Sequence, residues 1–132
     1  MKVKTINPAT EDLIAEYGNM TKEDVNNRVA KAKHAFTEWK NNYHTRAEFL
    51  HKVADEFSKN KSNLAKIATT VMGKPINQSL SEIDKCVLVM KYYADNGNIF
   101  LQDESLNTDA RKSTITFEPI GVIGCIMPWN FP

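Results

Sequence analysis

Apolar side chains recur at helical spacing through most of the chain. The first stripe begins after Thr21, a capping hydroxyl with a carboxylate three residues later, as at many helix starts. From there to Trp39 an apolar residue stands at every third or fourth position, which is the periodicity of one helix face. Similar stripes cover residues 49–57, 62–72 and 76–97. The pattern therefore predicts four helices, of which the last is the longest.

Residues at the helix ends support these boundaries. Thr45 is a candidate cap for the second helix. Gly73 followed by Pro75 is the expected stop for the third, because glycine tolerates the left-handed backbone of a helix end and proline cannot continue a helix. After the fourth helix, residues 102–112 are polar and are predicted to form a loop.

Four strands are predicted outside the helices. Val3–Ile6 and Leu13–Tyr17 flank the turn Asn7–Thr10 and should form a hairpin against the outside of the core. Ser113–Glu118 alternates apolar and polar residues, as half-exposed strands do. Val122–Met127 is wholly apolar, which is typical of a parallel strand buried on both faces. The last two strands should therefore lie in different sheets, and the fold class is α/β.

The predicted buried strand runs into a loop bracketed by Pro128 and Pro132. Because each proline fixes its own φ and restricts the residue before it, Trp129, Asn130 and Phe131 should be held in a stiff, non-helical loop. In open parallel sheets, ligands bind at the carboxyl ends of the strands. An amide at that position can stabilise negative charge that develops on a carbonyl oxygen, but asparagine is also a common turn residue. The residues alone leave both interpretations of Asn130 open.

Composition narrows the class of protein. The chain has 132 residues, 42% of them hydrophobic and 25% charged, as in an ordinary soluble domain. A formal net charge of +1 argues against nucleic acid as a partner. Neither a signal peptide nor a membrane span is recognisable, so we expect a cytoplasmic protein without a membrane partner.

Most other candidate groups are expected to be structural. Cys86 and Cys125 stand in apolar surroundings and should be free buried thiols. We expect no metal site, and the histidines and paired carboxylates should be solvated, namely His34, His44, His51, Glu82, Asp84, Asp103 and Glu104. The methionines and aromatic residues at helical or strand spacing should belong to the core, namely Met72, Met90, Met127, Phe36 and Trp39.

Glycine-rich phosphate sites are not indicated either. Gly121 and Gly124 lack the order of a dinucleotide fingerprint. Lys74, between Gly73 and Pro75, could in principle hold a phosphate, but no glycine-rich loop surrounds it. A solvated lysine at a helix stop is the favoured interpretation.

Four motifs resemble one known family. The segment Glu118–Pro132, which reads EPIGVIGCIMPWNFP, closely resembles the E-P-x-G-V-x-x-x-x-x-P-W-N-[FY]-P segment of the aldehyde dehydrogenase superfamily. Asn7–Thr10 resembles its N-P-A-T motif, Ala35-Phe36 with Trp39 resembles the end of its first helix, and Gly73–Pro75 resembles its G-K-P turn. The motifs occur in the family's order and span nearly the whole chain.

The resemblance implies the N-terminal part of a three-domain enzyme. Residues 1–103 would be the helical first segment of a Rossmann-like cofactor domain. Residues 104–119 would be an excursion into an oligomerisation sheet, and residues 120–132 the first strand of the cofactor sheet with an active-site loop. The intact protein would form a homodimer or homotetramer.

The resemblance also implies a reaction, the oxidation of an aldehyde to a carboxylic acid with NAD or NADP. Asn130 would donate to the oxyanion of a cysteine thiohemiacetal, Met127, Pro128 and Trp129 would lie along the bound cofactor, and Phe131 would line the aldehyde tunnel. The family's nucleophilic cysteine and general-base glutamate would lie beyond Pro132. Cys125 is not expected to replace that nucleophile, because a thiolate on a buried strand is disfavoured.

Two questions stay open at this level. The wording around residues 91–94 and 118–121 is most like the succinate-semialdehyde dehydrogenase branch, although the residues that select the substrate are absent. The alternative function is a truncated, non-catalytic helical scaffold or assembly fragment. In either case one parallel strand without neighbours should leave residues 120–132 unsupported in an isolated monomer. Four apolar side chains should then be exposed, namely Val122, Ile123, Ile126 and Phe131.

Overall fold

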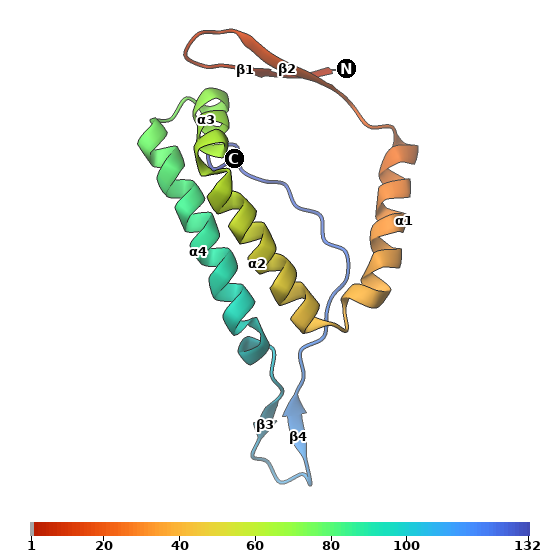
Figure 1. Cartoon of the computed structure of the whole chain (residues 1–132). Helices are drawn as coiled ribbons and strands as arrows, with labels where there is room; N and C mark the ends of the chain where they lie inside the picture. Colours follow the sequence, from red (N-terminus) through yellow and green to blue (C-terminus); the bar gives the residue numbers. More distant parts are fainter. Residues whose placement is uncertain (1) are drawn as a thin grey trace.

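Four helices and two small hairpins make up the computed structural model, which describes residues 2–132 (Figure 1). In chain order the elements are β1 (Lys2–Ile6), β2 (Leu13–Gly18), α1 (Lys22–Trp39), α2 (Tyr43–Lys59), α3 (Lys61–Met72), α4 (Ile76–Phe100), β3 (Glu104–Leu106) and β4 (Ser113–Ile115). All four predicted helices and the N-terminal hairpin are confirmed. No helix among the described residues is both long enough and apolar enough to cross a membrane.

Helices α2, α3 and α4 form the packed part of the molecule, with α4 in contact with both of the others. The buried hydrophobic residues are mostly small, namely Ala54, Ala65, Ala68, Ile83 and Ala94. Small side chains let helix backbones approach closely. A part-buried polar contact lies among them, since Thr69 Oγ1 and Ser79 Oγ are 2.8 Å apart. The core is therefore an alanine-lined seam centred on α4.

Side-chain caps set the starts of α1 and α2. Thr21 caps α1 as predicted. Its hydroxyl oxygen accepts from the backbone N–H of Asp24, and in return the side-chain carboxylate of Asp24 accepts from the backbone N–H of Thr21. The prediction that Thr45 caps the second helix is wrong. Asn42 is the cap, and its Oδ1 accepts from the backbone N–H of Thr45 at 3.0 Å, so α2 begins three residues earlier than a Thr45 cap would place it.

Acid is expected to loosen the start of α1. Hydrogen bonds from the hydroxyl and then the backbone N–H of Thr21 hold the pKa of Asp24 below its ordinary value of 3.8. A lowered folded-state pKa means that the carboxylate's contribution is complete above the ordinary value and is lost as the pH falls through the lowered one. Amide hydrogen exchange in the first turn of α1 should therefore accelerate in that acidic range.

The matched control for this pH effect is Asp24→Asn. The amide oxygen that it introduces can still accept from Thr21 but does not titrate, so first-turn exchange should lose its acid step. An equally steep acid step in the Asp24→Asn variant would contradict the assignment to this carboxyl.

The chain between α3 and α4 is tightly constrained. Gly73 ends α3 with φ of +81°, and its N–H donates to the carbonyl of Thr69 at 2.8 Å, as predicted for a glycine stop. A Cβ at Gly73 would lie 2.7 Å from Cγ of Pro8, in the turn of the β1–β2 hairpin. Glycine is required here by both the backbone and the neighbouring turn.

The N-terminal hairpin pairs β1 with β2 in antiparallel fashion, from Lys2 opposite Gly18 to Ile6 opposite Leu13. Its turn is held by Asn7, whose backbone and side chain accept from the N–H groups of Glu11 and Ala9 at 2.8 and 2.9 Å. The predicted turn over Asn7–Thr10 is therefore confirmed.

The second hairpin corrects two predictions. Residues 102–112 are not wholly loop, because Glu104–Leu106 forms β3. This strand pairs in antiparallel fashion with β4, and Leu106 lies opposite Ser113. The strand predicted over Ser113–Glu118 is shorter and ends at Ile115. Polar side chains hid β3, since an exposed two-stranded hairpin needs no apolar face.

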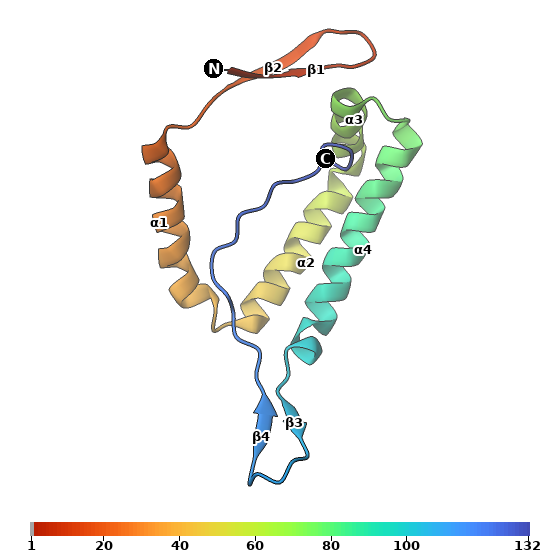
Figure 2. The ribbon, with the colours of Figure 1, turned by 180° about the vertical axis from the view of Figure 1, so that it is seen from behind.

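Residues 116–132 form an extended segment that returns from this hairpin between α1 and the α2–α4 pair and ends beside α3 (Figures 1 and 2). The buried strand predicted over Val122–Met127 is not formed, and no strand among residues 2–132 pairs with this segment. The expected exposure of the segment is confirmed, at 44% for Val122, 63% for Ile123, 101% for Ile126 and 63% for Phe131.

Several residues expected in the core are consequently exposed. Cys125 and Met127 lie on the extended segment and face solvent, and Cys86 on α4 is only half-buried. The apolar face of α1 is also largely open, since Val25 and Trp39 are exposed. Both cysteines are free, as predicted, but burial no longer explains why Cys125 should be inert.

Candidate active-site segment

The five residues Pro128–Pro132 lie at the end of the extended segment, next to the junction of α3 and α4 (Figure 2). Trp129 and Asn130 form a turn, in agreement with the stiff loop predicted between the two prolines. The side chain of Asn130 is exposed. Its amide is therefore free of burial within this chain and can meet a group from outside it.

Phe131 is the residue through which this turn contacts the helices. Nζ of Lys74 lies 5.2 Å from the centroid of the Phe131 ring, within the range of a cation–π contact. Phe131 also lines a cavity of about 650 Å³ whose other walls come from the first half of α4, including Gln78, Glu82 and Cys86. The loop is thus seated against α4 on one side only.

Lys74 forms an ion pair with Glu82, which corrects the prediction that both side chains are solvated. Lys74 is 8% exposed, and the Glu82 side chain is 14% exposed. Lysine and glutamate are rarely buried unless they are paired, because desolvation of a lone charge is costly. The ammonium group of this pair lies over the Phe131 ring, and Glu82 lines the same cavity as Phe131.

A sequence signal for this pair existed. Glu82 directly precedes Ile83 and follows Leu80 by two residues, and both belong to the predicted apolar stripe of this helix. The structure places Glu82 on the inner face of α4, where Ser79, three residues earlier, and Ile83 are both buried. A carboxylate at such a position requires a cation, and Lys74 precedes the same helix. The interpretation of Lys74 as a solvated helix-stop residue missed this because the two residues were considered separately.

The three residues expected along a nucleotide are also exposed. Met127 is 74% and Trp129 81% exposed, and Pro128 between them is exposed as well. They offer one accessible, mostly apolar wall, which fits contact with the uncharged parts of a nucleotide. No glycine-rich phosphate cradle accompanies them in residues 2–132.

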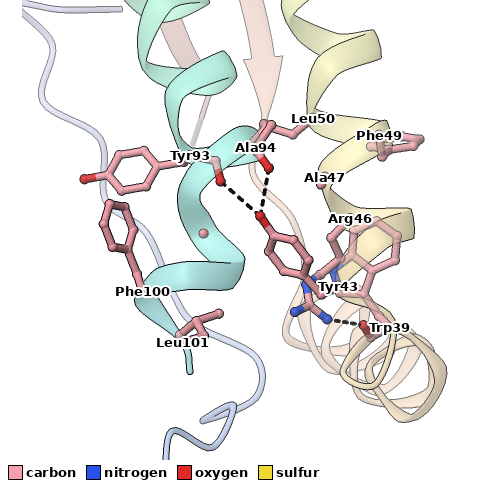
Figure 3. A pocket seen from close by; sticks show the side chains of 11 residues that line it. Trp39, Tyr43, Arg46, Ala47, Phe49, Leu50, Tyr93, Ala94, Phe100 and Leu101 are labelled. Atoms are coloured by element: carbon pink, nitrogen blue, oxygen red, sulfur yellow. Dashed lines mark hydrogen bonds between the residues drawn. The ribbon is translucent and has the colours of Figure 1, made fainter. Parts of the chain in front are cut away.

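A second cavity, of about 450 Å³, lies between α2 and α4 and is lined mainly by aromatic and aliphatic side chains (Figure 3). Its polar groups are engaged. The Tyr43 hydroxyl donates to the carbonyl of Ala94 at 2.7 Å, and Nη1 of Arg46 donates to the carbonyls of Trp39 and Lys40 at 2.8 and 2.9 Å. None of the predicted site residues lines it, and these polar groups are used for packing.

The remaining titratable groups are exposed or occur in isolated pairs across residues 2–132. His34 and His44 are exposed as predicted, whereas His51 is half-buried and its Nε2 lies 2.8 Å from the carboxylate of Asp95. Asp84 pairs with Lys61 on the surface at 2.6 Å. Across the described part of the chain, no group of three or more His, Cys, Asp or Glu side chains is arranged to hold a metal ion.

Comparison with known proteins decides the family. The profile described as the Aldehyde dehydrogenase family matches residues 1–132. The chain belongs to this family. Its α/β class and its place in the N-terminal portion of the aldehyde dehydrogenase fold, both predicted from sequence, are thereby confirmed.

Three relatives illustrate the match. A protein of Synechocystis sp. named "Probable succinate-semialdehyde dehydrogenase", with NADP(+) in its name, is 37% identical over 133 residues, covering 100% of this chain and 29% of the relative. The succinic semialdehyde dehydrogenase of Streptococcus pyogenes, solved with NADP+, has a TM-score of 0.81 at 28% identity over 86% of this chain and 25% of its own. Betaine aldehyde dehydrogenase of Staphylococcus aureus, solved with NAD+, has a TM-score of 0.87 at 27% identity over 100% of this chain and 27% of its own.

The chain thus spans less than a third of the length of these aldehyde dehydrogenases. The structure brings Met127–Phe131 together because they are consecutive, and it adds Lys74 and Glu82 behind them. The roles of these residues in catalysis and in cofactor binding stay predictions.

Proposed function

We propose that the whole protein oxidises an aldehyde to the carboxylic acid with NAD or NADP, and that this chain supplies Asn130 as an oxyanion donor. The observation that carries the proposal is the family match over residues 1–132, which includes the P-W-N-F-P segment. The side-chain amide of Asn130 is exposed at the end of that segment, so it is free to face a substrate held by the rest of the whole protein.

Each residue of the segment has a defined task in this proposal. When a thiolate of the whole protein adds to the aldehyde carbon, the carbonyl oxygen becomes an oxyanion, and the Nδ2–H of Asn130 donates to it. Such a donor stabilises the transition state more than the neutral carbonyl, because the charge develops as the bond forms. Pro128 and Pro132 restrict the turn, so that the amide needs little reorganisation when the charge appears.

The neighbouring side chains would contact the nucleotide on one side of Asn130 and the aldehyde on the other. Met127, Pro128 and Trp129 would contact the nucleotide, which accepts a hydride from the substrate carbon when bound. Phe131 would form an apolar wall for the aldehyde and limit the access of water. Hydrolysis of the resulting thioester would then release the acid, with groups of the whole protein acting on water.

Succinate semialdehyde is the first substrate to test. Proteins named as dehydrogenases of this aldehyde stand among the relatives in sequence and in structure. The competing candidate is a non-catalytic helical fragment, which is favoured for residues 1–132 alone by the exposed apolar segment. The 104–119 excursion, assembly as a homodimer or homotetramer, and a cytoplasmic location stay predictions.

The experiment is a turnover assay of the full-length protein. Succinate semialdehyde and a series of aliphatic aldehydes are each offered with NAD and with NADP, and reduced nucleotide is followed by absorbance. We expect turnover with at least one aldehyde, and none from residues 1–132 alone. Absence of turnover with every aldehyde and both nucleotides would overturn the proposal, whereas activity confined to other aldehydes would overturn only the substrate assignment.

A further inference from the structure

We propose that the Lys74–Glu82 ion pair is a positioning device that holds the Asn130 segment in place through the ring of Phe131. The catalytic consequence of this inference rests on the proposed role of Asn130, whereas the anchoring itself does not. Lys74 and Glu82 would be positioning residues, because neither would touch the substrate.

The first support is the burial of the pair. Lys74 and the side chain of Glu82 are both largely withdrawn from water although the chain has ample open surface. Replacement of either partner would leave an uncompensated buried charge. The end of α3 would form equally well with a solvated lysine at this position. The burial of Lys74 is therefore not explained by the helix end and points to a role in positioning its neighbours.

The second support is the rigidity of the backbone that carries Lys74. On one side stands Gly73, with its left-handed φ and its N–H bonded to Thr69. On the other side Pro75 caps α4, and its carbonyl accepts from the N–H of Ser79 at 3.2 Å. Because the lysine is fixed between two helix ends, the position of its ammonium group is defined mainly by Glu82.

The third support is the small number of other contacts available to the loop. Phe131 is 63% exposed and directly follows Asn130. Its ring receives the Lys74 ammonium on one face, and no strand ladder formed by residues 2–132 includes the loop. A contact that lies one residue from the amide and is backed by a buried pair can therefore set the orientation of the whole turn.

Lys85, another cation at this cavity, does not replace Lys74. Lys85 lines the same cavity as Phe131 but is exposed, so its ammonium group stays hydrated. A hydrated ammonium gains little from a ring face, whereas a desolvated one gains more. Because Lys74 is buried and paired with Glu82, its ammonium group can hold the Phe131 ring more strongly than Lys85 can.

The test uses the full-length protein and two variants, Lys74→Met and Phe131→Leu. Amide hydrogen exchange is measured at Trp129, Asn130 and Phe131. Each variant should accelerate exchange about three- to tenfold, the factor expected for loss of one partly desolvated cation–π contact. The double variant should show no further acceleration, because both substitutions remove the same interaction.

Kinetics provide the second measurement. Lys74→Met should lower kcat by a similar factor and leave the KM for nucleotide unchanged, since the amide is displaced but the nucleotide wall remains. Lys74→Arg keeps the cation and should restore both kcat and exchange. The matched control is Lys61→Met, which breaks the surface pair between Lys61 of α3 and Asp84 of α4 and should change neither.

The outcomes separate this inference from the proposed function. Unchanged exchange in Phe131→Leu, a variant that leaves the buried pair intact and so should fold, would overturn the anchoring. Additive acceleration in the double variant would overturn it as well. Faster exchange in Lys74→Met, with full turnover retained by Asn130→Ala, would support the anchor and reject the oxyanion role.

Discussion

Replacement of Asn130 by alanine in the full-length protein is expected to lower kcat about 10²–10³-fold, the usual cost of losing one oxyanion donor. Alanine removes the Nδ2–H and little else, because the side chain is exposed in this chain and supports no core contact. The KM for nucleotide should change little, since Met127, Pro128 and Trp129 are retained. Steady-state kinetics with the best aldehyde from the turnover assay measure both constants.

Two further variants sharpen this expectation. Asn130→Asp keeps the shape but brings an anion to the place where negative charge develops, so its kcat should fall at least as far. Asn63→Ala removes an exposed asparagine on α3 and should behave as the unmodified protein. Turnover of Asn130→Ala at the level of the Asn63→Ala control would show that the amide is a turn residue only.

The elements that sequence predicted best are those whose causes are local. The helix from Lys22 to Trp39 follows from its capping pair and its apolar period, and the end of α3 follows from the backbone freedom of Gly73. Even here the choice between Asn42 and Thr45 as a cap depended on geometry. Both residues can cap a helix, and the hydrogen bond from the Thr45 N–H to Asn42 decides it.

The strand over Val122–Met127 failed for a physical reason that sequence also contained. An apolar run indicates burial on two faces, but a strand exists only when neighbouring strands complete its hydrogen bonds. This chain offers none, so the run is extended and exposed. The pattern matches the environment that the family resemblance implies for these residues, and residues 2–132 do not supply that environment.

The candidate site was predicted as far as residue types carry chemistry. Asn130 and its neighbours were found through their motif, and their roles stay predictions. Lys74 and Glu82 were missed because a charge beside a helix start is usually solvated, and pairing across the α3–α4 junction is a tertiary fact. The rule that a carboxylate on a buried helix face needs a cation would have found them.

Ile83→Ala is expected to destabilise residues 1–132 by about 2–5 kcal/mol. Ile83 is 7% exposed, and within the described chain it is the buried hydrophobic residue that exceeds alanine in size. Neighbouring alanines cannot extend into the space that its truncation leaves, so the cavity should collapse poorly. Because domains are stable by only about 5–15 kcal/mol, the loss is a large share of the total.

Urea unfolding followed by far-ultraviolet circular dichroism measures this effect. The midpoint of Ile83→Ala should fall while the slope stays unchanged, since the surface exposed on unfolding is nearly the same. The matched control is Leu88→Ala on the same helix, where the side chain is 59% exposed and truncation leaves no enclosed cavity. Equal midpoints for the two variants would contradict the prediction. They would mean that the buried Ile83 side chain stabilises the folded chain no more than the exposed Leu88 side chain does, so that the alanine-lined seam of α2, α3 and α4 is not the stabilising core.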